Sequence, residues 1–191
     1  MTPGILITAA GLGTRYRAAG GCGLKLDQEL ADGLSVFQLT LRNACESGLP
    51  VHVVTRPSYA SIQADCRAMG ATFSCHETRC LGETIAQGVR HCVGWNGWLI
   101  QLADMPFVSA GMHRLVATAL QHHACARPFY WQSPGHPVGF GVVAREKLLQ
   151  LHNADCAQAV FQHFPPYSIS VVDEGVIKDV DLPSQLNRKP C

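Results

Sequence analysis

The chain has 191 residues, of which 47% are hydrophobic and 15% charged, and its 15 basic and 14 acidic residues give a net charge of +1. This composition excludes an intrinsically disordered chain, which combines low hydrophobicity with high charge. Because the sequence has no basic block and no apolar run of about 18 residues, neither nucleic-acid binding nor a membrane span is expected. The length predicts a single domain over residues 1–191.

Short β-rich runs alternate with helical patterns along the chain. The run at 4–9 is continuously apolar, as in a strand that is covered on both faces. Further strands are predicted at 51–55, 71–75, 98–102, 129–132, 139–144 and 168–172. This alternation is typical of α/β proteins, so we predict a three-layer α/β/α, Rossmann-like architecture around a mostly parallel sheet.

Helices are predicted between these strands. Ser35 and Gln38 have the spacing of a capping box, which begins a helix that runs to about Ser47. Other helices are predicted from a Ser58 cap to residue 69, at 82–93 and, from a Ser109 cap, to about residue 122. The last of these has an expected buried stripe of Met112, Leu115, Val116 and Ala119. Residues 11–32 are predicted to form one long functional or mobile loop.

The cysteines and the N-terminus bear on the compartment. The nine cysteines include no C-x-x-C pair, so neither a zinc ribbon nor a thioredoxin-type motif is predicted. The first apolar run is very short, and no basic residue precedes it, which is unlike a secretion signal. We therefore expect a cytoplasmic protein.

A glycine-rich segment, Thr8 to Arg15, leaves the end of the first predicted strand. In open α/β sheets, ligands bind beyond the carboxyl ends of the strands. Small residues let the backbone approach a ligand, exposed N–H groups bind phosphate oxygens, and the forked guanidinium of Arg15 suits phosphate. The segment is not a complete G-x-G-x-x-G, because Tyr16 stands at the final position, nor a Walker A sequence. A glycine turn without a ligand is the alternative interpretation.

Further motifs follow in chain order. They are AAGLGTR at 9–15 with Lys25 after it, LGETI and AQGV at 81–89, LADMPFV at 102–108, GHPVGF at 135–140 and DVDLPSQL at 179–186. Together they resemble the MobA-like nucleotidyltransferase family and, within it, the molybdenum cofactor cytidylyltransferase branch. This resemblance spans nearly the whole chain and implies a sheet of the nucleotidyltransferase type.

The resemblance implies an enzyme that transfers a nucleoside monophosphate from an NTP to a phosphorylated acceptor and releases pyrophosphate. The implied acceptor is molybdopterin or the molybdenum cofactor, with a molybdenum enzyme as a further partner. The sequence A-A-G at 9–11 favours CTP, because this form of the turn accompanies cytosine use in the family. Mg²⁺ is the expected metal, since it prefers carboxylates and phosphate oxygens.

The resemblance also assigns roles to particular residues. Asp104 would bind the metal, with Asp181 as a second acidic contact unless it only caps the turn before Pro183. Arg15 and Lys25 would hold the triphosphate and, with Asp104, form the catalytic group. The remaining nucleotide-binding candidates are Ala9, Ala10, Gly11, Gly13, Gly82 and Thr84, and His136 would contact the acceptor. The alternatives are a solvent lysine at 25, a plain helix start at 82–84 and a structural histidine at 136.

Three departures from the family pattern leave other functions open. Arg15 and Lys25 lie ten positions apart, which is wider than usual. The segment 153–158 lacks the arginine of the family's G-D-x-G-A-R, and Leu182 and Gln185 stand where Thr and Asp are usual. A non-catalytic relative that binds or delivers the cofactor and a sugar-phosphate nucleotidyltransferase are therefore alternatives, with a dinucleotide oxidoreductase as a more distant one.

Overall fold

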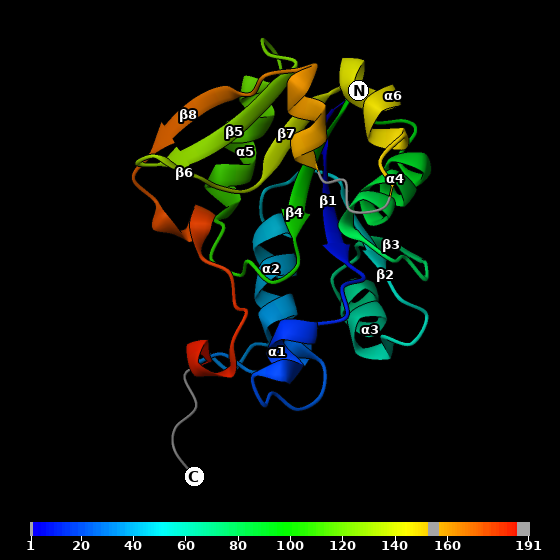
Figure 1. The fold of residues 1–191 in the computed structure, drawn as a ribbon, viewed down its shortest axis with the longest axis vertical. Coiled ribbons are helices and arrows are strands. Elements are labelled where there is room, and N and C mark those ends of the chain that lie inside the picture. Colours follow the sequence, from blue (N-terminus) through cyan, green and yellow to red (C-terminus); the bar gives the residue numbers. More distant parts are fainter. Residues whose placement is uncertain (1, 153–156, 187–191) are drawn as a thin grey trace.

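One mixed sheet collects all strands that the structure, a computed structural model, describes over residues 2–152 and 157–186 (Figure 1). The strands are β1 (Gly4–Ala9), β2 (Val51–Thr55), β3 (Thr72–Cys75), β4 (Gly97–Leu102), β5 (Cys125–Tyr130), β6 (Ser133–Pro134), β7 (Val138–Gly141) and β8 (Tyr167–Val171). Their order is β3-β2-β1-β4-β7-β5-β6, with β8 beside β5. β7 is antiparallel to β4 and β5, and β6 to β5, whereas the other pairs are parallel. The predicted α/β fold with a mostly parallel sheet is confirmed.

Helices cover both faces of this sheet. They are α1 (Thr14–Ala18), α2 (Val36–Cys45), α3 (Ala60–Ala68), α4 (Leu81–His91), α5 (Ala110–Ala119) and α6 (Arg145–Leu149), with short 3₁₀ turns at Lys25–Asp27, Val142–Ala144, Ala157–Gln162, Glu174–Ile177 and Pro183–Gln185. Ile5 and Ile7 of β1 pack into one core cluster with side chains of α2, α3 and α5, while Leu6 packs with α4 and α6. Alternate residues of a strand point to opposite faces, so these two clusters define three layers.

The connections create a crevice at one edge of the sheet. The chain runs from β1 outward through β2 to β3, and β4 then returns to the other side of β1. Such a reversal places the ligand site of an α/β sheet beyond the carboxyl ends of the two strands at the switch. Thr8 of β1 lies opposite Leu102 of β4 in the parallel register, so the chain leaves both strands at neighbouring points.

Several predicted boundaries need correction. The helix after Ser58 begins at Ala60, and its N-cap is Tyr59 without a side-chain hydrogen bond, so Ser58 is not the cap. The strand predicted at 139–144 ends at Gly141, where the chain enters a 3₁₀ turn. The strand predicted at 129–132 instead runs from Cys125 to Tyr130, because residues 126–130 pair in parallel with β8.

Two further expectations differ from the structure. Leu115 is exposed, and the buried face of α5 consists of Met112, His113, Val116 and Ala117, one residue round the helix from the predicted stripe. The segment 11–32 is not one irregular loop, because α1 and the 3₁₀ turn at Lys25–Asp27 lie within it. Within the described part of the chain, no helix has the length and apolar content of a membrane span.

Candidate active site

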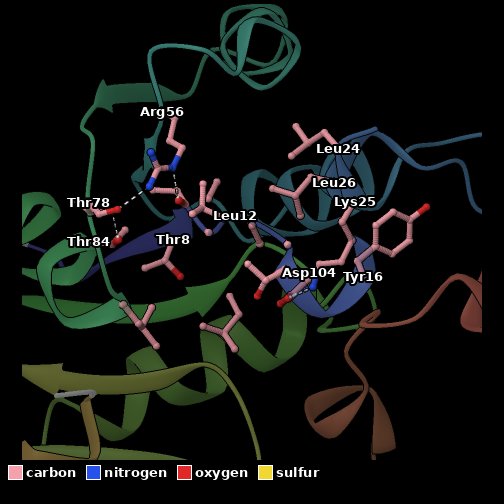
Figure 2. A pocket seen from close by; sticks show the side chains of 18 of the residues that line it. Thr8, Leu12, Tyr16, Leu24, Lys25, Leu26, Arg56, Thr78, Thr84 and Asp104 are labelled. Carbon is pink, nitrogen blue, oxygen red and sulfur yellow. Dashed lines mark hydrogen bonds and ion pairs between the residues drawn. The ribbon is translucent and has the colours of Figure 1, made fainter. Parts of the chain in front are cut away.

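A pocket of about 650 Å³ opens beyond the carboxyl ends of β1 and β4 (Figure 2). Its walls come from residues 10–13, which form the bend after β1, and from the turn around Lys25, the start of α4 and the end of β4. Among the predicted site residues, the pocket is lined by Ala9, Ala10, Gly11, Gly13, Arg15, Lys25, Thr84, Asp104 and Asp181. Residues up to 172 positions apart in the chain, from 9 to 181, therefore meet in one cavity.

The backbone of the bend after β1 is not covered by side chains at Gly11. Gly13 caps α1 in the left-handed conformation, with φ +62°, which a residue with a Cβ adopts only with strain. A side chain added at Gly11 would meet no atom within 4 Å, so this part of the backbone faces free space. The bend thus presents main-chain groups toward the pocket, as a phosphate-binding segment requires.

Arg56 braces this bend and was not predicted as a site residue. It is buried, and its Nε donates to Ala10 O at 2.8 Å while a terminal nitrogen donates to Thr78 O at 2.6 Å (Figure 2). The same guanidinium forms an ion pair with Glu77. Arg56 directly follows β2 at the edge of the sheet where the pocket lies, and this position is the signal that sequence reasoning missed.

Thr84 couples the start of α4 to the same wall. Its Oγ1 lies 2.7 Å from Thr78 Oγ1 and donates to Cys80 O at 3.0 Å. Gly82, in the same first turn, is buried and does not line the pocket. Of these two predicted nucleotide-binding residues, Thr84 lines the cavity and Gly82 does not.

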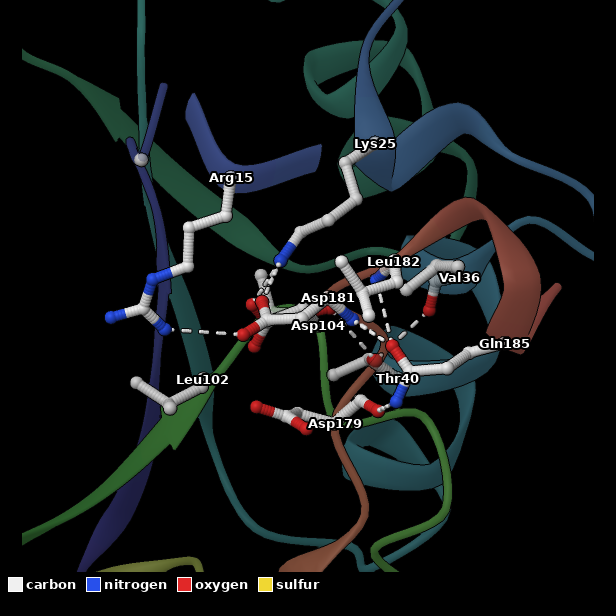
Figure 3. A network of polar contacts seen from close by, with 12 residues as sticks. Arg15, Lys25, Val36, Thr40, Leu102, Asp104, Asp179, Asp181, Leu182 and Gln185 are labelled. Carbon is white, nitrogen blue, oxygen red and sulfur yellow. Dashed lines mark hydrogen bonds and ion pairs between the residues drawn. The ribbon is translucent and has the colours of Figure 1, made fainter. Parts of the chain in front are cut away.

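Lys25 lies between two carboxylates at the floor of the site (Figure 3). Its Nζ donates to Asp104 Oδ2 at 2.6 Å and to Asp181 Oδ1 at 2.9 Å. Burial alone would lower the pKa of Lys25, but the charges and hydrogen bonds of Asp104 and Asp181 outweigh burial and raise that pKa. Lys25 is therefore a charged ammonium, and the wide spacing from Arg15 does not keep it out of the pocket.

Arg15 reaches Asp181 from the open side of the pocket. Its terminal nitrogen lies 3.2 Å from Asp181 Oδ2, and 84% of its side chain is exposed. Partial burial would raise the pKa of Asp181, but the hydrogen bonds and charges of Lys25 and Arg15 lower it overall. Asp181 is therefore ionised at neutral pH and faces two cations.

Main-chain contacts hold the two acidic segments together. Val180 N donates to Asp104 O at 2.9 Å, so the segment 179–181 lies along the end of β4. Gln185 Oε1 accepts from the backbone N–H groups of Asp181 and Leu182, each at 2.7 Å (Figure 3). Gln185, one of the departures from the family motif, thus fixes the turn that carries Asp181.

The acidic pair fits a divalent cation. Asp104 lines the pocket, and its buried Oδ1 has no hydrogen-bond partner, so this hard oxygen is not engaged by the protein. Within the described residues, no group of three or more His, Cys, Asp or Glu side chains is arranged to hold a metal. Two carboxylates are enough for Mg²⁺, which is commonly bound through one or two carboxylates together with waters and substrate phosphates.

His136, the predicted acceptor contact, is largely buried and is not among the residues that line this pocket. Its Nδ1 is 3.5 Å from Ile100 O, the carbonyl of a β4 residue. Burial, followed by the charge of Arg127, lowers the pKa of His136 to about 4, so the ring is neutral at pH 7. Of the segment 153–158, positions 153–156 lie outside the described residues.

Comparisons with known proteins show the family of the chain and solved structures with the same fold. The sequence profile of the MobA-like NTP transferase domain matches residues 5–167. The structure resembles that of Rv0371c from Mycobacterium tuberculosis H37Rv, with TM-score 0.80 and 17% identity, covering 96% of this chain and 95% of that one. A comparison with curated proteins found no match.

Two other solved structures show the same fold. A nucleotidyl transferase from Methanothermobacter thermautotroptrophicus aligns with TM-score 0.79 and 18% identity, over 96% of this chain and 93% of that one. Rv0371c was also crystallised in complex with manganese; that structure aligns with TM-score 0.72 and 17% identity, over 90% and 89% of the two chains.

Proposed function

Because the chain belongs to the MobA-like NTP transferase domain family of nucleotidyltransferases, we propose that it transfers CMP from CTP to a phosphorylated acceptor and releases pyrophosphate. The proposed acceptor is molybdopterin or the molybdenum cofactor. One observation carries the proposal: the open bend after β1, the buried Lys25 and the carboxylates of Asp104 and Asp181 all line a single pocket. Its volume of about 650 Å³ lies within the range of small-molecule sites.

Cationic groups would bind the triphosphate. The ammonium of Lys25 has three N–H donors that suit phosphate oxygens, and in the metal-free protein two of them go to Asp104 and Asp181. Arg15 is exposed at the pocket mouth, where its forked guanidinium can bind the β- and γ-phosphates, which leave together as pyrophosphate. The main chain of Gly11 and Gly13 would lie against the nucleotide, because a Cβ added at Gly11 would meet no atom within 4 Å and one added at Gly13 would meet only Lys25 Cβ, at 3.7 Å.

The metal would be held by Asp104 and Asp181. A divalent cation bound there would neutralise negative charge on the phosphates, and we propose that this ion is Mg²⁺. The manganese complex of the structurally similar tuberculosis protein supports a divalent cation. The protein's own part is to fix both carboxylates: Gln185 holds the turn of Asp181, and Val180 ties that turn to the Asp104 backbone.

The chemistry needs no dedicated general base. An acceptor phosphate already carries an anionic oxygen, which attacks the α-phosphorus of CTP as the bond to the β-phosphate breaks and pyrophosphate leaves. Catalysis then depends on aligning two polyanions and offsetting their charge, a task that we assign to Arg15 and Lys25. The neutral, buried His136 has no part in this proton balance.

A pyrophosphate-release assay tests the proposal. The purified chain is assayed with Mg²⁺ against CTP, GTP, UTP and ATP, each with molybdopterin, molybdenum cofactor and a panel of sugar and alditol phosphates. We expect turnover with CTP and a cofactor acceptor, and a loss of at least about 100-fold in Asp104→Asn, because the substitution removes a charge that acts on the transition state. Glu146→Gln on α6, away from the pocket, makes the same carboxylate-to-amide change and is the matched control.

Other outcomes of the same panel separate the alternatives. Turnover only with a sugar or alditol phosphate would assign that substrate class instead. Binding of the cofactor without pyrophosphate release from any nucleotide would indicate a delivery protein. Full activity in Asp104→Asn would contradict the proposed site even if the wild-type chain transfers CMP.

A further inference from the structure

The position of Lys25 is unusual for a lysine that only binds phosphate. Its side chain is buried, with 9% of the residue exposed, and its ammonium bridges two carboxylates from distant parts of the chain (Figure 3). Both contacts are at or below 2.9 Å, so the ammonium is centred between Asp104 and Asp181. Two acidic groups directed at one positive centre form the kind of environment that a metal cation occupies.

One carboxylate oxygen remains unused in this arrangement. Asp104 Oδ1 is buried without a hydrogen-bond partner, although a buried charged oxygen normally has one. A single ammonium satisfies Asp104 Oδ2 and leaves Oδ1 bare. The acidic pair therefore offers more ligand capacity than Lys25 uses.

We propose that Lys25 holds the place of the divalent cation in the metal-free protein, so that metal and ammonium compete for Asp104 and Asp181. A cation that binds both carboxylates displaces the ammonium, because two positive centres cannot share this buried position without strong repulsion. This inference rests on the proposed function only in requiring that the site take a divalent cation.

The fold gives the displaced ammonium a destination. The Lys25 side chain packs beside the bend, since a Cβ added at Gly13 would lie 3.7 Å from Lys25 Cβ. Four flexible methylenes let the head group turn while this stem stays in place. Displacement by a metal would thus move the ammonium along the bend, where a triphosphate is proposed to lie, and metal binding would release Lys25 for phosphate.

The first test measures Mn²⁺ binding to the full chain by electron paramagnetic resonance, without nucleotide or acceptor. Lys25→Met removes the competing charge and retains an unbranched stem. We expect its Kd for Mn²⁺ to fall at least ten-fold, which corresponds to about 1.4 kcal/mol. Lys25→Arg, which retains the charge, and Lys147→Met, which removes a charge on α6, should bind Mn²⁺ as the wild type does. Unchanged or weaker binding in Lys25→Met would overturn the inference.

The second test uses the wild-type chain, so it does not depend on a variant that folds poorly. Mn²⁺ is titrated without nucleotide, and acetylation of each lysine by acetic anhydride is followed by peptide mass spectrometry. We expect the labelling rate of Lys25 to rise several-fold with Mn²⁺, because displacement exposes the amine, while that of Lys147 stays constant. A Lys25 rate that does not rise would overturn the inference. Because neither readout involves turnover, the competition can fail while CMP transfer stands, and the reverse.

Discussion

Arg56→Met is expected to lower the stability of the protein and to weaken the support of the bend that lines the pocket. The buried guanidinium donates to Ala10 O at 2.8 Å and Thr78 O at 2.6 Å, so it joins the bend after β1 to the segment before α4. A hydrogen bond from a charged donor contributes about 1.5–3 kcal/mol, and its removal leaves the acceptor carbonyl unpaired. The ion pair with Glu77 adds little, because 66% of that side chain is exposed. Two lost bonds give an expected decrease of about 3–6 kcal/mol in the free energy of unfolding.

Urea unfolding checks the stability, and kinetics check the positioning role. Two-state unfolding free energies are compared for wild type, Arg56→Met and Arg56→Lys; the lysine has the charge but cannot reproduce the guanidinium fork, so about half of the loss is expected. Arg67→Met, which removes an exposed arginine over Phe73, is the control and should cost less than about 1 kcal/mol. We also expect the KM for the nucleotide to rise more than kcat falls. A stability loss below about 1 kcal/mol with an unchanged KM would refute the bracing role.

Three further predictions concern positions outside the pocket, of which His113 and Gly88 are buried and Gly111 is exposed. Burial lowers the pKa of His113 to about 4, below its unfolded value of about 6.5, so the neutral ring's contribution to stability is present above pH 6.5 and is lost as the pH falls toward 4. Because both ring nitrogens also lack partners, His113→Leu should be more stable than wild type at pH 5, by up to about 3 kcal/mol in thermal or urea unfolding; equal pH profiles would contradict this. Gly88→Ala should lower stability by about 1–3 kcal/mol, since its Cβ would lie 2.3 Å from the buried Leu6 side chain. Gly111→Ala, which meets no contact under 3.8 Å in α5, should raise stability by up to about 1 kcal/mol, and a loss there would show that helix propensity does not decide the sign.

Periodicity and capping predicted the fold wherever local chemistry and burial agree. The capping box of Ser35 and Gln38 is present, and β1 has the predicted bounds because each of its residues is buried. The errors come from tertiary context. The buried face of α5 includes His113, a polar residue that a hydrophobic stripe does not select, while Leu115 is exposed. The missing cap at Ser58 shows that a residue with the right chemistry caps a helix only if the chain turns at that residue.

The candidate site could be assembled only in part from the sequence. A carboxylate after β4 and a glycine bend after β1 were expected to converge, because neighbouring parallel strands end at one edge. The bridge from Lys25 to Asp104 and Asp181 could not be foreseen, since it depends on where three segments meet in space. Arg56 carries no motif; its position directly after β2 indicates the pocket end of the sheet, but its hydrogen bonds to Ala10 and Thr78 follow only from the structure.

The insertion between Arg15 and Lys25 explains how motif spacing can vary while the geometry of a site is maintained. The extra residues fold back on Tyr16, which is buried: a Cβ at Gly21 would lie 2.2 Å from the Tyr16 ring, so only glycine lets the backbone lie so close. Gly21 N also donates to Tyr16 O at 3.0 Å, which closes the turn. The chain therefore leaves this turn in position for Lys25 to enter the pocket. A family motif is defined by spacing along the chain, whereas binding of phosphate depends on the position of the Lys25 ammonium in space.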